Sequence, residues 1–120
     1  MTLHPSTPIV RSFDMQMAHT FYIEFLEFKV DWQHQHQADL PVYMQISKDA
    51  CTLHLSEHFA DASPGASIRI GCEDLKAYQT QLIQKQYKHA KPSITEQLWG
   101  IEMTISDPFG NRLIFFQTVE

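Results

Sequence analysis

The sequence predicts an α+β domain made of two modules with the same order of elements: one strand, one helix and three strands. Apolar residues recur at helical spacing after Asp14 and again after Asp74, and alternating, β-rich segments follow each helix. The irregular stretch 57–65, marked by Ser-Pro-Gly at 63–65, separates the two halves. Placing Asp14 over Asp74 aligns the two patterns although few residues are identical. An unrelated α+β domain is the alternative.

In the first half, a short alternating segment begins at Ile9, and Asp14 is positioned to cap a helix. That helix is predicted from apolar residues in adjacent pairs four apart: Met17, Ala18, Phe21, Tyr22, Phe25 and Leu26. Three segments rich in β-branched and aromatic residues follow, over 28–34, 42–47 and 51–56. We expect these to be strands.

In the second half, the alternation over 67–72 predicts a strand. After Asp74, one helical face carries the apolar residues Leu75, Tyr78, Leu82 and Ile83. Further strands are predicted over 101–106 and 112–118, on either side of the turn Asp-Pro-Phe-Gly-Asn at 107–111. A short strand over 89–91 completes the predicted module.

The composition indicates one domain spanning residues 1–120, without membrane or nucleic-acid partners. No apolar run approaches the roughly 20 residues that cross a bilayer, and no secretion signal precedes the first strand, so we expect a cytoplasmic protein. The formal charge of −5 disfavours nucleic acid and favours a cationic ligand. Cys51 and Cys72 have no metal or redox spacing, and we expect both to face a core rather than form a disulfide.

Two segments of the second half, 96–102 and 106–111, closely resemble the corresponding stretch of bleomycin-resistance proteins. Phe21-Tyr22 and residues 25–28 resemble the F-Y and L-G-F signature of the wider glyoxalase/bleomycin-resistance/dioxygenase, or vicinal-oxygen-chelate, superfamily. Glu27 stands where that family normally has Gly, so we expect a less sharply turned helix end. The resemblance implies two βαβββ modules, 7–57 and 66–118, whose mixed sheets curve around a cavity. It also implies a homodimer that completes two such cavities.

Metal-dependent members of this superfamily place His or Glu ligands on inward-facing strand positions. Carried over to this chain, those positions are Thr7, His54, Ser67 and Ile114, of which only His54 is a strong donor. The resemblance therefore implies a protein without a metal or other cofactor, and a binding protein rather than an enzyme. A metal-dependent lyase, isomerase or dioxygenase on the same fold is the alternative.

Other histidines offer weaker metal patterns. The string 54–58 matches H-x-x-E-H, but Thr52 to Ser56 alternates like a strand, in which positions four apart lie roughly 13 Å from each other. We therefore expect Glu57 and His58 to order the following loop. His34 and His36 could share a strand face as an adventitious metal site, although a solvated face is the simpler interpretation.

The predicted cavity has a mixed aromatic and polar lining. Alternation places these residues on the concave side: Tyr43, Gln45, His54, Ser67, Arg69, Glu102 and Ile114. The resemblance adds Trp32 and Trp99, near positions where bleomycin-resistance proteins stack planar rings of the drug; core burial of both tryptophans is the alternative. We expect the ligand-binding residues to be Trp32, Tyr43, Gln45, His54, Arg69, Trp99 and Glu102. The predicted ligand is a bleomycin-type antibiotic or another planar cation. A structural or interaction protein without a small ligand is a third hypothesis.

Overall fold

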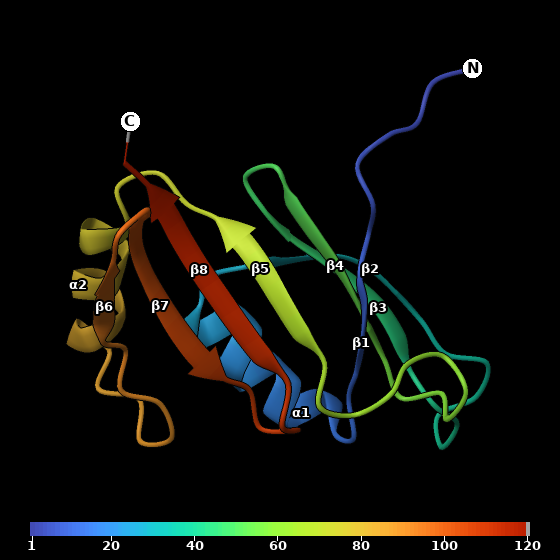
Figure 1. Cartoon of the computed structure of the whole chain (residues 1–120). Coiled ribbons are helices and arrows are strands. Elements are labelled where there is room, and N and C mark those ends of the chain that lie inside the picture. The colour runs from blue at the N-terminus through green and yellow to red at the C-terminus, as the bar shows by residue number, and fades with distance from the viewer. Residues whose placement is uncertain (120) are drawn as a thin grey trace.

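Two four-stranded mixed sheets, one from each module, lie side by side in a computed structural model that describes residues 1–119. The first sheet has the order β1-β4-β3-β2, formed by β1 (Ile9–Arg11), β2 (Lys29–His34), β3 (Tyr43–Lys48) and β4 (Cys51–Ser56). The second has the order β5-β8-β7-β6, formed by β5 (Ser67–Gly71), β6 (Ile94–Gln97), β7 (Gly100–Ser106) and β8 (Arg112–Thr118). In each sheet the first and last strands of the module pair in parallel and the other pairs are antiparallel. The predicted fold of two βαβββ modules is confirmed (Figure 1).

The first helix begins where the sequence predicts and then changes type. Asp14 caps α1 (Met15–Ala18) by accepting hydrogen bonds from the backbone N–H groups of Gln16 and Met17, at 2.8 and 3.0 Å. The chain continues as a π-helix, η1 (His19–Phe25), and the N–H of Leu26 reaches back five residues to the carbonyl of Phe21. The wider turn was not predicted, because four-residue spacing of apolar pairs is typical of an α-helix.

The expectation of a less sharply turned helix end at Glu27 is wrong. Glu27 adopts the left-handed conformation, with φ 67°, that a glycine would take there. A non-glycine residue gives up roughly 1–2 kcal/mol in that region. Its carboxylate accepts a hydrogen bond from Lys85 Nζ at 2.9 Å, which offsets part of that penalty and lowers the pKa of the Glu27 carboxyl.

The prediction of a short strand over 89–91 is also wrong. Those residues belong to the connection between α2 (Leu75–Gln84) and β6, and the missing strand is β6 itself, paired with β7 from Ile94↔Met103 to Gln97↔Gly100. The sequence 94–97, Ile-Thr-Glu-Gln, carries a single apolar residue, so its alternation was too weak to recognise. Pairing with β7, rather than local pattern, makes it a strand.

The helices cover one side of the sheets, and the opposite side, which we name the open face, carries no helix of the described residues 1–119 (Figure 1). In β3, Met44 and Ile46 are buried toward the helices, whereas Tyr43 and Gln45 alternate onto the open face and are only partly buried. One hydrophobic cluster contains buried residues of both modules. The molecule is a slab of 47 × 45 × 23 Å. Over residues 1–119, no helix is long and apolar enough to cross a membrane.

Buried hydrogen bonds hold the two modules in register. Tyr22 Oη of the first module donates to Asp107 Oδ2 of the second at 2.7 Å, and Tyr78 Oη donates to the carbonyl of Leu26 at 2.7 Å. Burial and the adjacent Asp107 carboxylate raise the pKa of Tyr22, and burial raises that of Tyr78. The phenols therefore stay protonated and can donate, which fixes how the two parts of the open face lie relative to each other.

Candidate functional site

Four of the predicted ligand-binding residues form one cluster on the open face of the first sheet. The Trp32 and Tyr43 rings are stacked, with centroids 5.9 Å apart and an interplanar angle of 10°, and the His54 ring packs edge-on against both, at 5.3 and 5.1 Å. Gln45 lies beside His54 in the neighbouring strand. We name Trp32, Tyr43, Gln45 and His54 the first-sheet cluster. Trp32 is 44% exposed, so its burial in the core is excluded.

A β-bulge in β2 places an acidic residue beside this cluster. The pairing of β2 with β3 shifts register between Val30 and Trp32, so Asp31 and Trp32 both reach side chains of the same face of β3. Asp31 accepts hydrogen bonds from Gln45 Nε2 and Ser47 Oγ, both at 3.0 Å. These bonds lower the pKa of the Asp31 carboxyl and keep it ionised beside Trp32.

A chain of hydrogen bonds fixes the orientation of the first-sheet cluster. Because Gln45 Nε2 donates to Asp31, its Oε1 is the atom that faces His54 Nε2, at 3.0 Å. An amide oxygen only accepts, so we assign the proton of neutral His54 to Nε2. His54 Nδ1 then accepts from Tyr43 Oη at 2.6 Å. Both ring nitrogens of His54 are therefore occupied, and the Tyr43 and His54 rings are held in place before any ligand arrives.

The other three predicted residues form a second-sheet cluster, together with Phe116, which sequence reasoning missed. The Arg69 guanidinium lies over the rings of Phe116 and Trp99, at 4.5 and 5.3 Å from their centroids, and pairs with Glu102 at 3.5 Å. Trp99 is 39% exposed and so is not a core residue. Phe116 lies two residues after Ile114 in β8, so alternation puts both side chains on the same face of the sheet. This signal could have identified Phe116 from the sequence.

The carried-over metal positions do not fit a divalent ion. His54 has no free ring nitrogen, Ser67 Oγ accepts hydrogen bonds from the Arg112 guanidinium at 2.9 and 3.1 Å, and Ile114 has no donor atom. Thr7 is exposed ahead of β1. Over residues 1–119, no three His, Cys, Asp or Glu side chains gather closely enough to hold an ion together.

The remaining candidate metal and thiol groups have simpler surroundings. His34 and His36 are close, with ring centroids 4.7 Å apart, and both are exposed. Glu57 Oε1 accepts from the N–H of Val42 at 2.9 Å, so this side chain ties the end of β4 to the segment ahead of β3 and not, as expected, to the loop that follows it. Cys51 and Cys72 are free thiols whose pKa values burial raises, so neither is an activated nucleophile.

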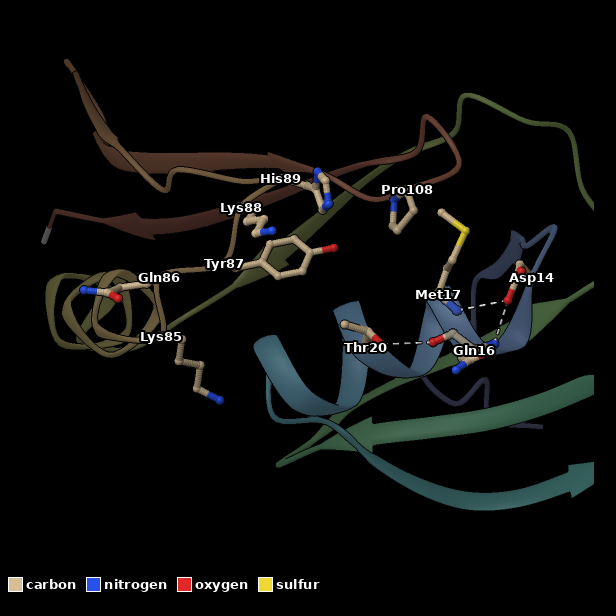
Figure 2. Close-up of a pocket in the computed structure, with 10 residues that line it drawn as sticks. All are labelled: Asp14, Gln16, Met17, Thr20, Lys85, Gln86, Tyr87, Lys88, His89 and Pro108. Carbon is tan, nitrogen blue, oxygen red and sulfur yellow. Dashed lines mark hydrogen bonds between the residues drawn. The ribbon is translucent and has the colours of Figure 1, made fainter.

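The structure also contains two hollows that were not predicted. Figure 2 shows a cavity of about 750 Å³ on the helical side, between the first helix and the connection after α2. Its lining residues are Asp14, Gln16, Met17, Thr20, Lys85, Gln86, Tyr87, Lys88, His89 and Pro108. A groove of about 920 Å³ runs along the seam between the modules and includes only Arg69 of the predicted residues. The predicted residues thus lie on an exposed sheet face rather than in a closed cavity of one subunit.

Comparison with solved structures shows the same fold in binding proteins. An antibiotic-binding protein from Streptomyces sp. CB03234 is 20% identical, with a TM-score of 0.76 over 99% of both chains. A bleomycin-binding protein from Streptomyces verticillus, complexed with copper(II)-bleomycin, is 20% identical, with a TM-score of 0.72 over 100% of this chain and 99% of the other. A glyoxalase family protein from Bacillus anthracis is 14% identical, with a TM-score of 0.75 over 99% and 98%. At these identities the likeness establishes the fold alone.

Sequence comparison identifies the family. No curated protein matches the chain significantly in sequence. A family model described as glyoxalase superfamily protein matches residues 1–120, the whole length given. The two βαβββ modules, the paired four-stranded sheets and this match agree, and the chain belongs to the glyoxalase superfamily.

Proposed function

We propose that this chain is a metal-free binding protein of the bleomycin-resistance type, which sequesters a planar cationic molecule on its open face. The ligand class is a bleomycin-like glycopeptide antibiotic or a similar compound. The observation that carries the proposal is the first-sheet cluster, in which the exposed Trp32 ring stacks on Tyr43, whose hydroxyl is fixed by its hydrogen bond to His54. An exposed, preorganised aromatic surface binds with little loss of side-chain entropy.

The charges around the rings favour a cation. Asp31 is ionised next to Trp32, and a planar cation over the indole face would gain both stacking and Coulomb attraction. The second-sheet cluster already displays this chemistry within the chain, because the Arg69 guanidinium lies over Trp99 and pairs with Glu102. A planar cation from solution would meet the same combination of ring and carboxylate at the first sheet.

A comparison with solved structures further supports the proposal. Solved structures with this fold include a bleomycin-binding protein complexed with bleomycin, 21% identical over 98% of this chain. A ligand on the open face also needs a second wall, which a partner subunit would supply in the predicted homodimer.

Calorimetric titration with metal-free and copper-loaded bleomycin tests the proposal, alongside unrelated planar cations. We expect saturable binding that weakens in Trp32→Ala, because that substitution removes one stacked ring of the first-sheet cluster. Elemental analysis of protein purified without chelator tests the rival metal-dependent lyase, isomerase or dioxygenase. Stoichiometric tightly held zinc, nickel, manganese or iron would favour the enzyme.

A further inference from the structure

Arg11, the last residue of β1, is a buried cation that forms no ion pair within residues 1–119. The residue is only 9% exposed, and its Nη1 nitrogen makes no hydrogen bond to any residue in 1–119. No carboxylate of the same range lies within 4.0 Å of the guanidinium. Its charge instead faces the rings of Phe13 and Phe59, at 4.8 and 5.9 Å from their centroids. The nearby carboxylate of Asp61 is engaged by Ser56, the strand partner of Arg11, at 2.6 Å, so the buried Nη1 lacks an acceptor that a ligand oxygen could supply.

Strand pairing places Arg11 on the open face, close to the first-sheet cluster. Arg11 pairs with Ser56, and Ser56 pairs with Tyr43, so the three residues form one row across β1, β4 and β3. Paired residues share a face of the sheet, and two strand spacings amount to about 10 Å. One ligand of ordinary size can therefore reach from the Tyr43 ring to the Arg11 guanidinium.

Two exposed aromatic rings lie beside the Arg11 guanidinium. Phe59 lies in the connection between the modules and is 90% exposed, so its ring gives up little buried surface when it moves aside. Phe13 is also largely exposed. The rings are thus available as apolar walls around a group that approaches the guanidinium.

We propose that Arg11 receives an oxyanion, most simply a carboxylate, carried by the same ligand whose ring lies on the first-sheet cluster. A carboxylate matches the planar guanidinium fork with two parallel hydrogen bonds. This inference rests on the proposed function and deepens it. Asp31 on β2, whose carboxylate lies 3.9 Å from Lys29 Nζ, and Arg11 on β1 place an acidic and a basic group at opposite edges of the face. The ligand class is accordingly a planar zwitterion rather than a simple cation.

A matched pair of dyes tests the inference on the full chain. Rhodamine 110 is a planar cation with a free carboxylate, and rhodamine 123 is its methyl ester. We expect fluorescence anisotropy to show at least about fivefold tighter binding of the carboxylate dye. Arg11→Met should abolish that preference and leave ester binding unchanged. Arg112→Met removes the same charge from the second sheet, where Arg112 bonds Ser67, and should keep the preference.

Thermal unfolding supplies a second readout that a structural role would not give. Without ligand, Arg11→Met should melt at or above the wild-type temperature, because an apolar side chain replaces an uncompensated buried charge. Sodium benzoate, compared with sodium chloride at equal ionic strength, should raise the melting temperature of the wild type but not of Arg11→Met. A clear drop in melting temperature for Arg11→Met would show that the guanidinium holds the fold together and would overturn the inference.

The outcomes separate this inference from the proposed function. If both dyes bind equally and Trp32→Ala weakens both, the aromatic face binds planar ligands and the anion site is wrong. If neither dye binds, planar-cation binding fails, and the benzoate comparison alone decides the role of Arg11. An equal benzoate effect on wild type and Arg11→Met would then refute the anion site as well.

Discussion

At the scale of single residues, Trp99 is the side chain for which sequence reasoning left two roles open. Its partial exposure and its contact with Arg69 indicate a surface role. We expect Trp99→Ala to weaken ligand binding severalfold, since an aromatic stacking contact is worth about 1 kcal/mol beyond area burial. The melting temperature should change little, whereas truncating a core tryptophan would lower stability by roughly 3–5 kcal/mol.

Leu98 provides a matched control for Trp99. It precedes Trp99 in the same β6–β7 turn and is fully exposed. Leu98→Ala should leave both affinity and melting temperature unchanged. Calorimetry and thermal unfolding on the two variants distinguish the roles; a Trp99→Ala protein that melts far lower yet binds normally would assign Trp99 to the core.

Tyr22 predicts a specific dependence of stability on alkaline pH. Its folded-state pKa is raised, mainly by burial and then by Asp107, whereas an unfolded tyrosine titrates near 10. Below pH about 10 both states hold the proton and the contribution is complete. Above it the unfolded state loses the proton first, so the free energy of unfolding falls as pH rises toward the folded pKa.

Tyr22→Phe isolates this effect. The variant should be less stable at pH 8 by about 1–3 kcal/mol, because buried Asp107 loses one hydrogen-bond donor. Its free energy of unfolding should then decline less steeply than that of the wild type between pH 10 and 11. Urea unfolding across this range measures both quantities, and parallel declines would contradict the assignment.

At the scale of elements, the sequence predicted the strands and helices with strong periodicity. It missed the features that depend on contacts with other parts of the chain. The alternation of Cys51–Ser56 and Arg112–Thr118 specified both strands with the bounds found. By contrast, β6 has one apolar residue, and the π-helix and the β2 bulge depend on tertiary packing. The alternation of side chains along the strands was enough to place Tyr43, Gln45 and His54 on one face. Alternation could not show that Asp31 lies on the same face as Trp32, because the bulge between Val30 and Trp32 interrupts the two-residue period of the strand.

The β6–β7 turn depends on Gly100. Gly100 has φ 156°, and an added Cβ would lie 2.1 Å from the carbonyl oxygen of Gln117 in β8. We expect Gly100→Ala to lower stability by about 3 kcal/mol, because backbone rather than a flexible side chain must shift. Gly110→Ala is the control, since Gly110 also has a positive φ but open space around it, and should cost about 1 kcal/mol. Equal losses in denaturant unfolding would contradict the steric explanation.

At the scale of the whole molecule, the open face implies a partner subunit. One side of each sheet lacks a helix, and every residue of the edge strand β2 is exposed. Such a surface is normally covered in a stable protein. We predict a homodimer, with a light-scattering mass of twice 13.9 kDa. A mass of 13.9 kDa at all working concentrations would count against the dimer and against a ligand site completed by two subunits.

The central claim is that ligands bind on the open face and not in the cavity on the helical side (Figure 2). Nuclear magnetic resonance tests it directly, because the chain has only two tryptophans and their indole N–H signals are resolved from the backbone. On titration with bleomycin, the Trp32 indole signal should shift saturably while the amide signals of Thr20 and Lys88 stay in place. Saturable shifts at Thr20 and Lys88 with an unmoved Trp32 indole would contradict the account.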